Sequence, residues 1–252
     1  MTPNPPIQDA RAAVQRRDLD FRHLAAGNAR ITTAARITIA IAWVALLAAP
    51  IALLIGHFGL HDLSWTRSQI STYAAQAPNA AWITAAMLLA ALSLLCLGIS
   101  ISSRRTQGAG IFNQIASMMF GVAVSGLLIL AYFKETAAST TQLKKMGFAA
   151  IRQQTFHDAG LLLFFYGSAA ALAIAGVVVS LRAADWLGRA SGIVVALTGP
   201  IAYGALISPW TKYLGFVGAD AGMKQRAAFL ALWIGGLVLL TAVTNKKRAG
   251  SQ

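Results

Sequence analysis

Residues 57–79 read HFGLHDLSWTRSQISTYAAQAPN, and this polar stretch separates two long apolar runs. It holds two of the four histidines of the chain, together with an Asp, an Arg, three Ser, two Thr and a Tyr. The flanking runs, 37–56 and 80–101, each have the length of about 20 residues that crosses the hydrocarbon of a bilayer as a helix. The stretch therefore predicts a polar loop that joins two membrane-spanning helices at one face of the membrane.

The composition of the whole chain agrees with a membrane protein. Of its 252 residues, 57% are hydrophobic and only 12% are charged. A soluble domain carries about 25% charged residues, so the charges here are too few to cover a soluble surface. Four more runs of spanning length follow, at 111–133, 159–181, 190–208 and 227–244. We therefore predict an all-α fold, a polytopic six-helix transmembrane bundle of three out-facing helical hairpins.

The basic residues predict the orientation of this bundle. Residues 1–36 and 245–252 form two basic tails, and the short turns after the second and fourth spans each carry two arginines. Cytoplasmic loops of membrane proteins are enriched in Lys and Arg. We therefore predict a multi-pass membrane protein with both termini in the cytoplasm; the family resemblance given below implies the bacterial inner membrane. The net charge of +13 then reflects topology and contact with membrane lipids, and nucleic acid is not a predicted partner.

The segment between the third and fourth spans, residues 134–154, is polar and basic. Its apolar residues Leu143, Met146 and Ile151 recur at roughly the spacing of one helical face, and the neighbouring basic side chains can extend toward water. We predict a short interfacial helix in this segment.

The six predicted spans contain no Asp, Glu, Lys, Arg or His. Ion-coupled transporters and proton relays place ionisable groups at depth, so this pattern counts against a secondary transporter. Pro50 and Pro200 lie inside the first and fifth spans, where we interpret them as packing kinks; a binding site opened in the backbone is the alternative. Glycines that permit close helix approach lie at Gly121, Gly126, Gly160, Gly167 and Gly176.

Polar side chains gather at one predicted level, the outer interface. The mouths of three hairpins share one face of an up-down bundle, so residues from all three segments can converge there. The candidate catalytic residues are Ser68, Ser71, Tyr73, Glu135, His157 and Asp158. The candidate binding residues are Arg67, Lys224, Gln225 and Arg226.

Two chemistries are open to these residues. A serine activated by His157, with Asp158 or Glu135 to orient the imidazole, would follow the logic of a hydrolase. The sequence has no Gly-x-Ser-x-Gly motif around either serine, and the serines would also serve to cap a short helix. Arg67 and Arg226 would instead hold a lipid phosphate through paired hydrogen bonds.

A cofactor is a further alternative. Four side chains could act as metal ligands, namely those of His57, His61, Asp62 and His157. Three such ligands together with a water would make a catalytic zinc site. The spacing matches no HExxH motif, and Gly59 weakens the helix that would align the first two histidines. A haem held between two histidines of different helices is the second alternative. We predict no cofactor and keep zinc and haem as alternatives.

Four short motifs carry a resemblance to a known family. An acid ends the third span, and the other three motifs are Ser68-Gln69-Ile70-Ser71-Thr72-Tyr73, His157-Asp158 and Lys224-Gln225-Arg226. With these motifs, residues 37–244 resemble the uncharacterised bacterial membrane family called domain-of-unknown-function 998, whose members have six predicted spans. The resemblance implies the same fold and the same outer polar level, but it implies no reaction. The chain departs from the family at residues 133–136, FKET, where a Pro and an Asp are expected, so Glu135 is not matched to the family's acid.

Three functions follow from these observations. The first is an accessory membrane protein without catalysis, which binds lipid or a partner in a larger membrane complex. The second is a membrane-embedded hydrolase or transferase, with or without a metal, that acts at the outer face. The third is a transporter of small solutes. The sequence leaves open whether the protein is an enzyme.

Overall fold

We describe the protein from a computed structural model of the chain. The structure describes residues 33–58, 68–76, 79–103, 110–136, 140–207 and 220–245. Contacts between residues divide the chain into two units, 1–38 and 39–252. Within the first unit, the described residues 33–38 are helical. The arrangement of helices given below concerns the second unit.

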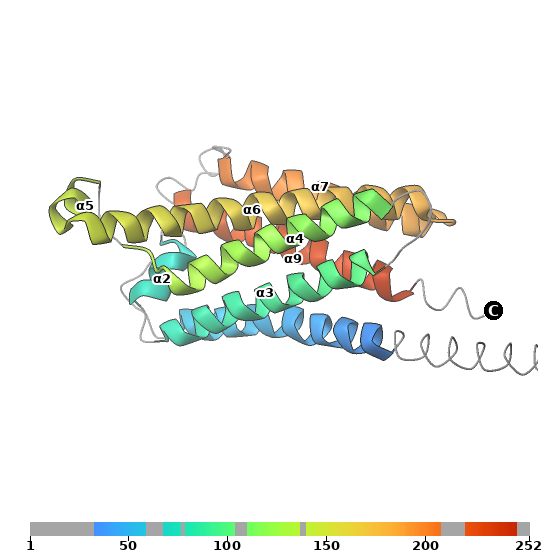
Figure 1. Ribbon diagram of the computed structural model, residues 1–252, viewed down its shortest axis with the longest axis horizontal. Helices are drawn as coiled ribbons and strands as arrows, with labels where there is room; N and C mark the ends of the chain where they lie inside the picture. Colours follow the sequence, from blue (N-terminus) through green and yellow to red (C-terminus); the bar gives the residue numbers. More distant parts are fainter. Residues whose placement is uncertain are drawn as a thin grey trace, which may run out of the picture. The chain divides into compact units, whose positions relative to one another are not determined.

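The described part of the chain contains six helices that are long and apolar enough to cross a membrane. They are Thr33–His57, here called the first helix, α3 (Ala80–Ser102), α4 (Gly110–Tyr132), α6 (Phe148–Arg182), α7 (Trp186–Ile207) and α9 (Asp220–Asn245). Two short helices, α2 (Ile70–Gln76) and α5 (Thr140–Met146), lie between long ones (Figure 1). None of the described residues forms a strand, so the predicted all-α six-helix fold is confirmed.

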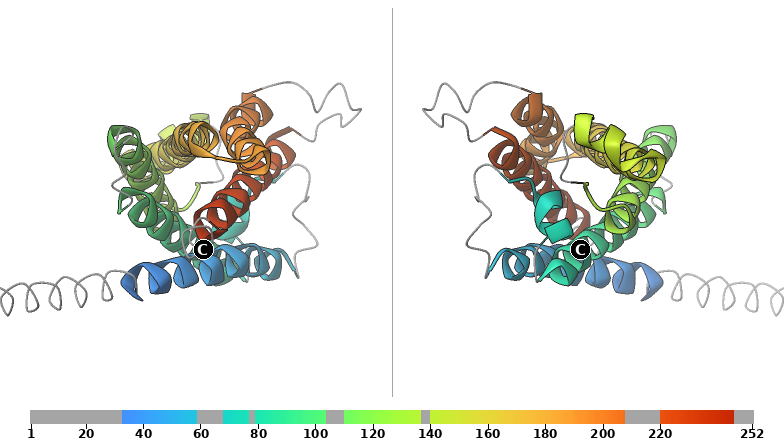
Figure 2. Two further views of the ribbon diagram at one scale, coloured as in Figure 1. Left: turned by 90° about the vertical axis from the view of Figure 1, so that its right-hand side faces the viewer. Right: turned by 90° about the vertical axis from the view of Figure 1, so that its left-hand side faces the viewer.

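The long helices pack in the order of the sequence. α4 lies against α3 and α6, and α7 lies against α6 and α9. Figure 2 shows the bundle from its two ends, with the first helix running across the view. The first helix contacts α3 and α9, since Ser93 and Trp233 of these helices donate hydrogen bonds to its backbone. Since each long helix reverses the direction of the one before it, α2, α5 and the beginnings of α6 and α9 all lie at one end. This end is called the α2 end below, and α2 itself packs against α3 and α9 there.

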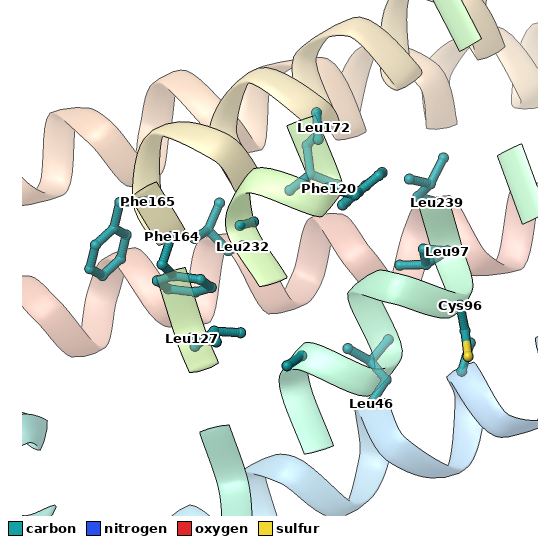
Figure 3. Packing of buried hydrophobic residues seen from close by; sticks show 14 of the residues in the cluster. Leu46, Cys96, Leu97, Phe120, Leu127, Phe164, Phe165, Leu172, Leu232 and Leu239 are labelled. Atoms are coloured by element: carbon teal, nitrogen blue, oxygen red, sulfur yellow. The ribbon is translucent and has the colours of Figure 1, made fainter. Parts of the chain in front are cut away.

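Apolar side chains fill the interior between the helices. Figure 3 shows Leu127, Phe164 and Leu232, which come from α4, α6 and α9 and belong to one buried cluster. The outward faces of the same helices are apolar too, as exposed Leu128 and Leu162 illustrate. Helices that are hydrophobic all round are typical of membrane spans, where the outward side chains meet lipid. The architecture is therefore that of a multi-pass membrane protein.

Four of the five glycines predicted at helix contacts do lie against a neighbouring helix. A Cβ placed on Gly126 would lie 2.6 Å from a carbonyl oxygen of α6, and Gly160, Gly167 and Gly176 are equally close to neighbouring atoms. Glycine allows these backbones to approach because it has no side chain in the way. The prediction is wrong for Gly121, since a Cβ there would meet nothing within 4 Å.

The loop between the third and fourth spanning helices contains the short helix that the sequence predicts, but with different limits. α5 ends at Met146, and Gly147 follows with a φ of 90°, a conformation that glycine adopts without strain. Ile151, which we expected on the same short helix, instead belongs to α6. That helix begins at Phe148, well before the predicted span at 159–181.

Candidate functional site

Arg226, on the second turn of α9, joins three segments of the α2 end. Its Nη1 donates a hydrogen bond to the backbone oxygen of Ser68 at 2.9 Å, and its Nη2 donates to Nε2 of His57 at 3.0 Å. Its guanidinium carbon lies 5.5 Å from the centre of the Tyr73 ring, within the range of a cation–π interaction. One side chain thus connects the first helix, the α2 segment and α9.

The contacts of His57 determine its tautomer. A guanidinium can only donate, so Nε2 of His57 accepts and Nδ1 carries the proton. Nδ1 then donates to the backbone oxygen of Leu53 at 2.6 Å, and the imidazole lies 4.2 Å from the Tyr73 ring between centroids. Both nitrogens of this neutral imidazole are therefore engaged in bonds within the protein.

Gln225, the neighbour of Arg226, positions the short helix α2. Its side chain is 5% exposed, and its Oε1 accepts a hydrogen bond from the backbone N–H of Ile70 at 2.7 Å. This N–H lies in the first turn of α2, where no carbonyl of the same helix is available. Gly222 permits the approach, since a Cβ there would lie 3.0 Å from the carbonyl carbon of Ser68. Sequence reasoning missed Gly222, because a glycine in the first turn of a helix carries no distinct signal.

A second group of polar residues surrounds the end of α4. Oγ1 of Thr72 donates to Oε2 of Glu135 at 2.8 Å, which links α2 to the segment after α4. His157 of α6 is 1% exposed, and its Nδ1 donates to the backbone oxygen of Phe133 at 2.8 Å. The other ring nitrogen, Nε2, is buried and has no hydrogen-bond partner among the residues that the structure describes.

Asp158, the neighbour of His157, has a different environment. It is exposed, and its Oδ1 accepts a hydrogen bond from Nε2 of Gln154 at 2.8 Å. Oε1 of the same glutamine accepts the backbone N–H of Thr136 at 3.0 Å. Gln154 thus ties the beginning of α6 to the loop after α4. Sequence reasoning named neither Gln154 nor Thr72 as a site residue, although Thr72 lies inside the motif that carries the family resemblance.

The structure therefore brings some of the predicted site residues together. Tyr73, the backbone of Ser68 and Arg226 meet around His57, and Glu135 bonds to the same α2 helix. Within the described ranges, no hydrogen bond joins His157 to a serine or a carboxylate. Lys224 is half-buried on the first turn of α9.

Some of the predicted residues lie outside the described residues, namely His61, Asp62, Arg67 and the side chain of Ser71. Among the residues that the structure does describe, no group of three His, Cys, Asp or Glu side chains could hold a metal ion. The zinc and haem alternatives remain predictions.

No family model matches the sequence, and neither a curated protein nor a solved structure matches it. The resemblance to the six-span family thus remains a prediction, and any function has to be argued from the α2 end itself.

Proposed function

We propose that this chain is a non-catalytic protein of the bacterial inner membrane that binds the phosphate of an anionic lipid headgroup at its α2 end, through Arg226. The observation that carries the proposal is the fixed guanidinium. Arg226 donates hydrogen bonds to Ser68 and His57 and contacts the ring of Tyr73. These three partners belong to two segments that are far from Arg226 in the sequence. This geometry orients the cation before any ligand arrives, which lowers the entropic cost of binding.

The position of Arg226 favours a lipid as the anion. The spanning part of α9 begins at Gly222, so Arg226 lies near the boundary between hydrocarbon and headgroups. Guanidinium groups match phosphate oxygens through paired hydrogen bonds. Lys224, which lies two residues before Arg226 on α9, places a second cationic side chain at the same end. With both termini in the cytoplasm, as we propose, this site faces the outer leaflet.

The other observations agree better with binding than with catalysis or transport. The buried residues of the described helices are mostly apolar, with Ser93, Ser168 and Thr198 among the few polar ones, and no ionisable residue lies within the predicted spans. The candidate base His157 bonds to a backbone carbonyl, and its partners in the described ranges include no nucleophile.

Native mass spectrometry of the purified full chain tests this proposal. Phosphatidylglycerol and phosphatidylcholine are titrated separately into the detergent-solubilised protein. We expect one phosphatidylglycerol to bind more tightly than phosphatidylcholine, and Arg226→Gln to weaken it about tenfold, since a charge-assisted pair is lost. Arg226→Lys keeps the charge but loses the forked geometry, so we expect an intermediate loss.

Arg152→Gln is the matched control, because it removes the same charge from an exposed position at the same end. Thermal melting of each variant verifies that it is folded. If Arg152→Gln and Arg226→Gln reduce binding equally, or if the two lipids bind alike, the proposed site is refuted.

One observation supports the second candidate, a hydrolase or transferase. The buried Nε2 of His157 has no hydrogen-bond partner in the described ranges, and such a nitrogen could serve as a general base or a metal ligand. Elemental analysis for zinc and labelling by a fluorophosphonate probe would test this function. Either zinc at one ion per chain or labelling of a serine would favour the enzyme, if it is lost in His157→Ala but kept in Arg152→Ala, which changes an exposed residue of the same helix. Absence of both from folded protein would count against it.

A further inference from the structure

α6 is longer than a membrane requires. It has 35 residues, which corresponds to about 52 Å of helix against about 30 Å of hydrocarbon. Asp158 is exposed on α6, and an exposed carboxylate is unfavourable in hydrocarbon, so the hydrocarbon begins on the C-terminal side of this residue. The helix rises by about 15 Å from Asp158 back to Phe148, and a typical tilt of about 20° hardly shortens this distance.

A headgroup layer is only about 5–8 Å thick, so this geometry puts Phe148 beyond it, in water. The neighbouring helix α5 then lies outside the interface at which the sequence predicts it. Figure 1 shows the same feature: α5 and the beginning of α6 project past the ends of α3 and α4. The projecting part, which consists of α5, Gly147 and residues 148–156 of α6, is called the α5–α6 tip below.

The α5–α6 tip exposes large apolar side chains to this water. Met146 is 58% exposed, Phe148 77% and Ile151 40%. On α6, positions 148 and 151 share one helical face. The opposite face carries buried His157, which bonds to the segment after α4. Half-buried Gln154 lies on the flank between these two faces and bonds to the same segment. The apolar face of the tip therefore points away from the bundle, and the described part of the protein does not cover it.

The charges of the tip are of one sign. Lys144 and Lys145 in the last turn of α5, and Arg152 on α6, are exposed. The sequence has no Asp or Glu from Thr140 to His157. An apolar patch with a polar rim marks an interaction site on a protein surface. Here the rim is basic throughout, so a complementary partner surface has to be acidic.

From these observations we infer that the α5–α6 tip docks an acidic amphipathic helix of a partner protein, outside the membrane. The apolar face of that helix covers Met146, Phe148 and Ile151, and its carboxylates pair with Lys144, Lys145 and Arg152. The height of Phe148 above the hydrocarbon favours a protein over the membrane surface as the occupant. This inference does not depend on the lipid site proposed at Arg226.

The test uses the full chain in nanodiscs of phosphatidylcholine, which carry no net charge. Two amphipathic helical peptides share one apolar face, and one has Glu on its rim where the other has Lys. Fluorescence anisotropy of the labelled peptides measures binding. We expect the Glu-rimmed peptide to bind at least about tenfold more tightly, and Phe148→Ser to weaken it about tenfold. Phe58→Ser, which removes another exposed aromatic ring at the same end, should have no effect.

Charge reversal makes the test specific. In the double variant Lys144→Glu with Lys145→Glu, the preference should pass to the Lys-rimmed peptide. If neither peptide binds the folded protein, or if the reversal leaves the preference unchanged, the inference is wrong.

Docking of a partner protein must also be distinguished from binding of the α5–α6 tip to the membrane surface. An environment-sensitive dye on Phe148→Cys, in a Cys96→Ala background, reports the polarity around this position. We expect the emission to remain that of water in vesicles of phosphatidylglycerol. A blue shift that deepens with the fraction of anionic lipid would mean that the tip binds the membrane, and would overturn the inference.

Discussion

The two sides of the bundle are held together by different interactions. On one side, α4, α6 and α7 pack through glycines: a Cβ placed on Gly176 of α6 would lie 2.6 Å from the carbonyl oxygen of Gly192 of α7. On the other side, side chains donate hydrogen bonds to backbone carbonyls of the first helix. Trp233 of α9 donates to Leu46 at 2.9 Å, and Ser93 of α3 donates to Ala42 at 3.2 Å.

This difference indicates on which side of the bundle the helices can shift when a residue is replaced. Lipid is as apolar as the helix faces, so helices associate through close packing and hydrogen bonds. Two backbones in contact at a glycine leave no room for a side chain, whereas a single interhelical hydrogen bond in a membrane contributes about 0.6 kcal/mol on average. The α2 end, with Arg226 and His57, belongs to the hydrogen-bonded side. We therefore expect substitutions on the glycine side to cost the most stability, and those on the other side to cost less stability and to disturb the site as well.

Gly176→Leu should have the largest effect. Its side chain would enter the backbone of Ala196, which cannot move aside, so we expect a loss of about 3 kcal/mol or more in the free energy of unfolding. The control is Gly204→Leu on α7, where a Cβ would meet nothing within 4 Å. Unfolding in mixed micelles measures both variants. Equal losses in the two variants would mean that the close contact at Gly176 does not decide stability, and would refute the comparison.

The sequence predicted the glycine side well. Apolar runs of spanning length gave the six helices, and four of the five selected glycines lie at helix contacts. Glycine spacing did not reveal which way each residue faces, and so Gly121 was included wrongly. The beginning of α6 was not predictable from hydropathy, because hydropathy indicates where the membrane ends and not where the helix ends.

The hydrogen-bonded side was predictable only in part. Four residues lie between predicted spans in the sequence, which placed them at one level of the membrane, namely Tyr73, Gln225, Arg226 and His157. In the structure, each of them lies at the α2 end. The pairs themselves depend on how the chain packs. Gln225 and Ile70 are 155 positions apart in the sequence, and no local pattern indicates that one caps the other.

His57→Leu should have the next largest effect, because it removes the acceptor of a charged donor. A hydrogen bond to a charged group contributes about 1.5–3 kcal/mol, so we expect a loss of about 2 kcal/mol. A double-mutant cycle with Arg226→Met measures the coupling. His57→Leu should cost much less in the Arg226→Met background, and additive losses would show that the two side chains do not interact.

Gln225→Leu should cost about 1 kcal/mol, since it leaves the buried N–H of Ile70 without an acceptor. The effect should be local, and hydrogen exchange of the Ile70 amide should accelerate while exchange in the core of α6 stays slow. Gln225→Glu is the control, because a carboxylate oxygen can accept the same bond. Unchanged exchange at Ile70 in Gln225→Leu would mean that this side chain does not hold α2 in place.

Trp233→Phe should have the smallest effect, about 0.6 kcal/mol, the average for one hydrogen bond between helices in a membrane. Phenylalanine keeps most of the ring packing and loses the N–H that donates to Leu46. The control is Trp82→Phe, because Trp82 is 47% exposed on α3. The free energies of unfolding of the two variants, measured in micelles, should differ by the contribution of this one hydrogen bond. A loss in Trp233→Phe as large as that in Gly176→Leu would mean that the two sides of the bundle are held equally firmly, and the contrast between them would fail.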